Sequence, residues 1–323
     1  MTGIITQGAA EAKARIGKAP RGWRDAALLS VGGLLLWWLC RYHASWMPVW
    51  APWDFSWLWY GAYALTGWSY VRGLKRVATP RWRIALFAIG MVLIWAVLQT
   101  RFEYLAQHMF FLNRVQHMVM HHLGPFLISL AWPWTVLEAG APRWLKRVIA
   151  HRWFDAVLRF FQRPDTACVL FVGLIALWLF PPVHFVAMID PRLYAVMNWS
   201  MVADGVLFWS VVLDPRSAAE AHNSFAARII MAVVVAPPQI AMGAAIAFTN
   251  SDIYTFYAWC GRIFPTIDAV SDQHIGGLIV WIPPAMMSVL GLLIALNLMR
   301  IDEERRAGPA SGRGVSSSGW TGR

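Results

Sequence analysis

Long apolar runs alternate along the chain with short polar segments, most of which are basic. A helix needs about 20 apolar residues to cross the hydrocarbon core of a membrane, so this pattern predicts membrane-spanning helices. The first run, residues 26–41, is short for a span, but Trp37 and Trp38 followed by Arg41 are typical of a helix end at the membrane interface. The predicted spans cover approximately residues 26–41, 55–70, 84–100, 115–137, 166–180, 194–213, 226–248 and 275–299.

The polar ends of the chain predict a simple domain organisation. Residues 1–24 place Lys and Arg among small residues and are expected to form a flexible basic cytoplasmic arm. The first apolar run begins too late for a cleavable signal peptide. Residues 25–300 are expected to form the transmembrane domain, and residues 301–323, which are charged and then rich in Gly and Ser, a disordered cytoplasmic tail.

Composition supports the membrane assignment. Hydrophobic residues make up 58% of the 323 residues, 21 of the residues are Trp, and the mean hydropathy is +0.48, which is more apolar surface than one soluble core can bury. We therefore predict an all-α, polytopic bundle of about eight transmembrane helices. The three cysteines show no CxxC pair and neither require nor exclude a disulfide, for example between Cys40 and Cys260.

The distribution of basic residues predicts the orientation of the bundle. The net charge is +11, and 23 of the 28 Lys and Arg residues fall on the side that would hold both termini. Basic loops stay in the cytoplasm, so the N and C termini are expected there, and the basic charge needs no nucleic-acid partner. The basic amphipathic segment Pro142–Pro164 is expected to lie on the inner membrane surface, with its apolar side chains in lipid. These side chains are Trp144, Ile149 and Phe154, and the basic residues expected outside are Arg41, Arg101, Arg114, Arg192 and Arg262.

Four histidines gather between residues 107 and 125, at the start of the fourth predicted span. His117 and His121 are four residues apart, so on an α-helix their side chains lie on one face and can reach one metal ion. His122 points about 100° away from His121 and is expected to contact a neighbouring helix or the interface. The predicted topology places every histidine except His151 and His222 on the outer side of the membrane. This predicts a metal site at the outer mouth of the bundle.

The donor types favour copper, although simpler explanations exist for individual residues. Imidazole suits copper, zinc and iron, and thioethers add a preference for cuprous copper. A single interfacial histidine such as His43 is more often a hydrogen-bonded anchor, and the nearby methionines are more often ordinary packing residues. Those methionines are Met109, Met118, Met120 and Met188.

Asp204 falls near the middle of the sixth predicted span, where an ionised carboxylate is costly unless it is paired, protonated or hydrated. Gln239 lies near mid-depth of the seventh span, after Pro237 and Pro238, which lack the N–H groups that would bond carbonyls of the preceding turn. We expect Asp204, Gln239 and these carbonyls to form a polar pocket beneath the outer histidines. The alternative is a kinked bundle with one buried, hydrogen-bonded aspartate.

Several segments together resemble the multi-span CtaG-type cytochrome c oxidase assembly factors, a bacterial inner-membrane family. The resemblance covers approximately residues 104–299, whereas the first hundred residues match in hydropathy only. The segments are QHMVMHHLGPFL, PPVHF, LYAVM, NWSMVADGVLFW, APPQIAMGAAIAFT and SDQHIGGLIVWIP.

The resemblance implies a role in maturing a haem-copper oxidase, in the bacterial inner membrane, by supplying or stabilising copper. The positions it carries over are His117, His121, His184, Asp272 and Gln273. Asn198 and Asp204 stand where some members of the family have histidines, so a ligand set from the sixth span is not expected here.

The leading hypothesis is a copper-binding protein that delivers the metal at the periplasmic face to oxidase subunits through His117 and His121. The further candidate ligands are His108, His184, Asp272 and His274, and the candidate intramembrane pocket comprises Asp204, Gln239 and Asn198. No nucleophile with its base, P-loop or dinucleotide fingerprint is present, so catalysis is not expected.

Two other functions fit the same residues. One is a membrane electron-transfer protein in which His117 pairs with His184 or His274 as axial ligands of haem b. The other is a metal-free scaffold that docks oxidase subunits.

Overall fold

A helix occupies each of the predicted spans. The computed structural model describes residues 22–307, and no strand is present in that range. The predicted all-α fold is therefore confirmed. Six of the spans are single helices: α2 (Gly22–Tyr42), α3 (Trp57–Leu74), α4 (Arg81–Leu98), α11 (Pro164–Leu179), α13 (Pro191–Val212) and α17 (Ala269–Ala307).

The other two spans are interrupted, and proline explains both breaks. The fourth span begins as an α-helix, continues as one π-helical segment and ends as an α-helix that starts just before Pro125. The seventh span breaks at Val235, and Pro237 and Pro238 stand in the first turn of its second half. Their segments are α6 (Phe110–His117), η2 (Met118–Leu123), α7 (Gly124–Ala131), α14 (Phe225–Val234) and α15 (Ala236–Ala247).

Four of these segments are long and apolar enough to cross a membrane by themselves, as judged within residues 22–307. They are α4, α13, α17 and the stretch Phe225–Ala247, which comprises α14 and α15. The pair α10–α11 is bent by 69° and raises the number to five if it counts as one span. The protein is therefore a helical membrane protein.

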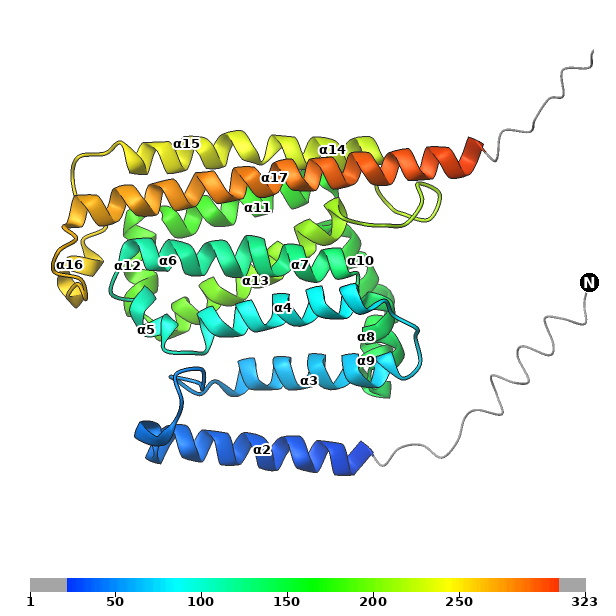
Figure 1. Cartoon of the computed structure of the whole chain (residues 1–323), viewed down its shortest axis with the longest axis horizontal. Helices are drawn as coiled ribbons and strands as arrows, with labels where there is room; N and C mark the ends of the chain where they lie inside the picture. Colours follow the sequence, from blue (N-terminus) through cyan, green and yellow to red (C-terminus); the bar gives the residue numbers. More distant parts are fainter. Residues whose placement is uncertain (1–21, 308–323) are drawn as a thin grey trace, which may run out of the picture.

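Short helices gather at the two ends of the bundle (Figure 1). The end that carries α12, called here the α12 end, also carries α5 and α16. The opposite end, called the α10 end, carries α8, α9 and α10, and both described ends of the chain lie there. The short helices are η1 (Ala44–Trp46), α5 (Phe102–Ala106), α8 (Trp134–Gly140), α9 (Arg143–Ile149), α10 (Arg152–Phe161), α12 (Pro181–Ile189) and α16 (Phe256–Cys260).

Helices α9 and α10 form the amphipathic segment that the sequence predicts between Pro142 and Pro164. Neither helix contains a buried residue, and Trp144 and Trp153 are among the exposed large side chains. Their place at the α10 end, beside the start of α2, agrees with a segment that lies along a membrane surface.

The ends of the chain differ in part from the expected domain boundaries. Helix α2 begins at Gly22, within the predicted basic arm, and α17 continues to Ala307, within the predicted tail. The remainder of the arm and the tail lies outside the described residues. All three cysteines are free thiols.

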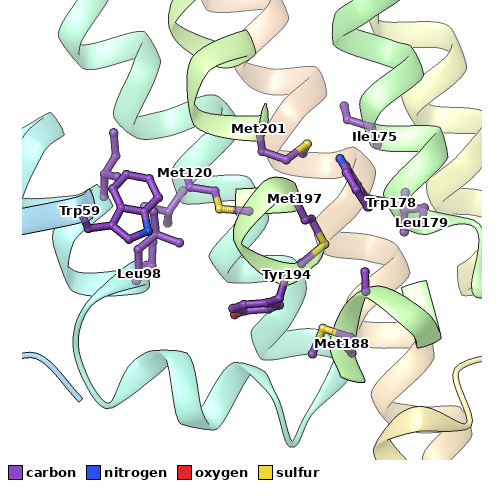
Figure 2. Packing of buried hydrophobic residues seen from close by; sticks show 14 of the residues in the cluster. Trp59, Leu98, Met120, Ile175, Trp178, Leu179, Met188, Tyr194, Met197 and Met201 are labelled. Atoms are coloured by element: carbon purple, nitrogen blue, oxygen red, sulfur yellow. The ribbon is translucent and has the colours of Figure 1, made fainter. Parts of the chain in front are cut away.

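The interior of the bundle is partly polar, and much of its exterior is apolar. Large apolar side chains are exposed along α2, α4 and α17, whereas Asn, Gln, His, Asp and Arg side chains are buried between the helices. The apolar core itself is rich in methionine: Met188, Met197 and Met201 follow α12 and α13 through the middle of the bundle, near Trp178 (Figure 2). This arrangement suits a lipid environment, where apolar surfaces face outward and polar groups need partners inside.

Helices α3 and α8 pack with their backbones almost in contact, because glycine stands on both. A Cβ atom added to Gly73 would lie 1.9 Å from the carbonyl oxygen of Val136, and one added to Gly140 would lie 1.8 Å from that of Ser69. Small residues allow such close approach in membranes, where helices associate by packing.

We predict that Gly73→Ala lowers the thermal unfolding temperature Tm of the purified protein by several degrees, because the added methyl group meets backbone atoms that cannot move away. Gly67→Ala on the same helix is the control, since nothing lies within 4 Å of its Cβ position and alanine favours helix by about 1 kcal/mol. Equal Tm values for the two variants would show that α3 and α8 are not held at this distance.

Candidate metal centre

The candidate site is built on a π-helical segment, η2, that contains His121 and His122. In an α-helix the carbonyl of His121 would accept a hydrogen bond from residue 125, but Pro125 has no N–H to donate. The N–H of Gly124 instead donates to the carbonyl of Val119, five residues earlier, as in a π-turn. Residues five apart on such a segment approach one another as residues four apart do on an α-helix. The distortion therefore brings His122, rather than His121, onto the side of His117.

Helix α13 approaches η2 closely and places an acceptor beside His121. A Cβ atom on Gly205 would lie 2.2 Å from the carbonyl oxygen of His121, so only glycine permits this contact. The neighbouring residue, Asp204, then lies with its Oδ2 2.9 Å from Nε2 of His121, and the imidazole of His121 is fully buried. When Asp204 is ionised, its carboxylate accepts from Nε2–H, and Nδ1 of His121 is then an unprotonated lone-pair nitrogen.

The His122 side chain is oriented in the same way by α15. Nε2 of His122 lies 2.9 Å from Oε1 of Gln239. The amide nitrogen of Gln239 donates to the carbonyl of Val235 at 2.8 Å, so Oε1 is the atom that faces His122 and accepts its proton. Nδ1 of His122 is thereby also an unprotonated nitrogen. Gln239 thus bonds to the carbonyl of Val235, which is not one of the carbonyls that Pro237 and Pro238 leave free, and Asp204 is joined to His121 rather than to Gln239.

Three buried imidazole nitrogens in this cluster have no hydrogen-bond partner: Nε2 of His117, Nδ1 of His121 and Nδ1 of His122. The rings of His121 and His122 are 4.7 Å apart and both pack on Phe171 of α11. A buried nitrogen without a partner is costly, so the cluster has unused capacity to bind a ligand.

A cavity of about 30 Å³ lies beside the cluster. His117 and His122 line it together with Met118, Met201 and Arg114. The remaining walls are apolar and come from α11 and α17. The volume admits about one or two water-sized groups. The histidines are therefore buried inside the bundle and not at an open outer mouth.

The other predicted ligands each have local hydrogen-bond partners. His184 on α12 donates from Nδ1 to the carbonyl of Trp178 at 3.1 Å and accepts at Nε2 from the hydroxyl of Tyr257 at 2.9 Å. His108 is bonded through Nδ1 to the carbonyl of Tyr104 at 2.8 Å. Neither histidine has the free, buried nitrogen that marks the central cluster.

The residues at the start of α17 organise the α12 end of the bundle. Both carboxylate oxygens of Asp272 accept backbone N–H groups at the start of α6, from Phe110 and Phe111, and Oδ2 also pairs with Arg262. An acidic group at a helix N-terminus satisfies donors that the helix leaves free. Asp272 therefore acts as a cap and ion-pair partner.

Gln273 and His274, which follow Asp272, form hydrogen bonds with the loop between α15 and α16. Gln273 accepts from the N–H of Ile253 and donates to carbonyls in the loop after α15, and His274 is bonded to the carbonyl of Thr249 at 3.1 Å. Asn198 is buried on α13, but no hydrogen bond joins it to Asp204 or Gln239. Within residues 22–307 no three His, Cys, Asp or Glu side chains converge as a metal-binding group.

Sequence reasoning undervalued two residues. His122 was expected to be peripheral because an α-helical geometry was assumed, and the signal that could have corrected this is Pro125, four residues after His121. Arg114 was grouped with the outer basic residues, whereas it is buried beside the cavity. Its position directly before the fourth predicted span, which the sequence analysis starts at residue 115, is the available signal.

A carboxyl group at the α12 end titrates near neutrality. Burial raises the pKa of Glu103 from 4.5 to about 8, and the nearby Asp54 carboxylate raises it further. Glu103 lies on the short helix α5, outside the spans.

The fold and the cluster define a class: a helical membrane protein with imidazole, carboxylate and amide groups buried between its helices. The chain belongs to the cytochrome c oxidase caa3 assembly factor family (Caa3_CtaG), whose family model matches residues 61–300. This match confirms the family resemblance and begins earlier than the quoted motifs, within α3. No curated protein and no solved structure matches the chain significantly.

We predict that Asp204→Leu lowers the stability of the protein, because Nε2–H of His121 loses its acceptor while it stays buried, at a cost of about 1–3 kcal/mol. Asp204→Asn is the matched variant, since its amide oxygen can still accept that proton. Thermal unfolding of the three proteins in one detergent checks this order. A Leu variant as stable as the wild type would mean that the hydrogen bond does not hold η2 to α13.

We predict that stability declines as the pH rises from 4.5 towards 8, because the folded protein holds the proton on Glu103 more tightly than the unfolded chain does. The contribution is complete at the acidic limit and is lost above the folded pKa. Glu103→Gln should flatten the dependence of Tm on pH over this window, whereas Glu138→Gln, at an exposed position, should leave it unchanged. Parallel curves for wild type and Glu103→Gln would contradict the raised pKa.

Proposed function

We propose that this protein assists the maturation of a haem-copper oxidase by binding cuprous copper inside the bundle and passing it to oxidase subunits at the periplasmic face. Membership of the oxidase assembly factor family supports the biological role. The observation that carries the copper proposal is the set of three unpartnered, buried imidazole nitrogens on His117, His121 and His122.

The tautomers support metal binding. Metal-bound histidines usually donate their second ring N–H to a carboxylate or another oxygen acceptor, which fixes the ring and raises the basicity of the ligating nitrogen. Asp204 and Gln239 stand in this relation to His121 and His122. The two Nδ1 atoms are therefore the proposed primary ligands, and His117 is the nearest further imidazole along the cavity.

The surrounding groups favour the cuprous ion. Thioethers prefer soft metals, and Met118 and Met201 line the same cavity as His117 and His122. Asp204 lies 2.9 Å from the His121 ring, and its ionised form would offset the charge of a bound cation. The cavity volume of about 30 Å³ suits a single ion, whereas a haem beside His117 would require the helices to separate. These contacts give copper more support than the haem b alternative.

The proposed arrangement in the membrane is eight spans in the bacterial inner membrane with both termini in the cytoplasm. The helix in every predicted span supports the number. Both described chain ends lie at the α10 end, which also carries the basic helices α9 and α10, and this supports a cytoplasmic position for that end. The α12 end then faces the periplasm, where the oxidase subunits would receive the metal. The protein acts in this proposal by binding and transfer, without catalysis.

The test measures copper binding and oxidase assembly in the same variants. Purified wild-type protein is expected to bind Cu(I) in competition with a colorimetric chelator. His121→Ala/His122→Ala is expected to lose this binding, and Asp204→Leu to weaken it about 10- to 100-fold. His108→Ala and His274→Gln are the matched controls, since these histidines bond backbone carbonyls away from the cluster.

Each variant is also produced in cells that lack the wild-type protein, and the oxidase activity of their membranes is measured. Loss of copper binding with loss of oxidase activity supports the proposal. Full oxidase activity in the double variant would overturn it. Wild-type protein that binds no copper but still associates with the oxidase would favour the metal-free scaffold.

A further inference from the structure

Arg114 is a buried cation without a carboxylate partner. Its side chain is 3% exposed on α6, inside the bundle. Its polar neighbours are the side-chain oxygen of Asn113 and the hydroxyl of Tyr257, and its guanidinium lies 4.9 Å from the ring of Phe110. All of these groups are neutral. No carboxylate lies within 4.0 Å of Arg114 among residues 22–307.

Two other arginines have the ionic or hydrogen-bond partners that Arg114 lacks. Arg262, at the α12 end, is paired with both Asp252 and Asp272. Arg228 is as buried as Arg114, but it donates to the carbonyl oxygens of Asp214 and Asn223 and lines no part of the cavity described above. Arg114 alone of the three combines burial, a lack of anionic partners and a place on a cavity wall.

The unused donors of this region belong to residues that line the cavity. Nε of Arg114 and Nε2 of His117 have no hydrogen-bond partner, and both residues line the space of about 30 Å³. No carboxylate contributes to the lining. A buried cation is unfavourable without a neutralising charge, and the low-dielectric surroundings strengthen its attraction for an anion. The cavity volume, the positive charge of Arg114 and the available N–H donors therefore all favour a small anion.

We propose that this cavity binds a small monovalent anion, a halide such as chloride, as the counter-ion of Arg114. Nε–H of Arg114 donates to the ion, and His117 donates through Nε2–H in its corresponding tautomer. A halide is similar in size to a water molecule and fits the volume, whereas sulfate or phosphate does not. The halide site shares His117 and the cavity with the proposed copper site, and it differs in its charged residue, which is Arg114 rather than Asp204.

The experiment uses the full-length protein in detergent with a chelator present, so that copper is absent. Thermal unfolding is recorded in chloride, bromide, gluconate and sulfate at equal ionic strength. Chloride and bromide are expected to raise Tm by about 5 °C in a saturable manner at concentrations well above Kd. Arg114→Gln should abolish this halide effect, whereas Arg192→Gln, at an exposed position, should retain it.

A second measurement does not depend on the folding of a variant. Wild-type crystals grown in bromide are expected to show an anomalous peak in the cavity between Arg114 and His117. Equal stabilisation by gluconate and halide, a halide effect that persists in Arg114→Gln, or the absence of the bromide peak would each overturn the proposal. Because copper is excluded from every sample, these results stand apart from the copper-binding test.

Discussion

The hydrogen bond between His121 and Asp204 is the interaction on which the central arrangement depends. It joins the irregular segment η2 to α13 where no water can replace a lost partner. Gln239 then joins α15 to the same segment through His122. A membrane bundle gains little from the hydrophobic effect between its helices, so such polar contacts specify which helices meet and in which register. The cluster is therefore structural even if no ligand is bound.

Close backbone approach makes these polar contacts possible. Gly205 lets α13 reach the carbonyl of His121, and Gly276 and Gly277 let α17 lie against α6 and α15. In each case a side chain would meet atoms at distances that real Cβ atoms do not adopt. The glycines allow the helices to approach closely. The buried polar side chains can then form hydrogen bonds between those helices.

The charges are arranged unevenly along the cluster. Asp204 lies next to His121, whereas Arg114 lies three residues before His117 and lines the same cavity as His117. A cation is favoured at one side and an anion at the other, since electrostatic interactions are strong in a region from which water is excluded. Each neutral imidazole of the cluster can present an N–H donor or an unprotonated nitrogen, depending on its tautomer. The surroundings of His121 and of His117 therefore favour ions of opposite charge.

Hydropathy and proline positions determined the helical segments, and the quoted motifs determined the family, because these signals depend on local sequence alone. The pair His117 and His121 illustrates the limit: its predicted convergence assumed a regular α-helix. The π-turn before Pro125 brings His122 to the cavity instead and turns His121 towards Asp204. Only the tertiary structure decided this, and it also assigned Asp272 to a helix cap, because partners that lie far apart in the chain meet only when the helices pack.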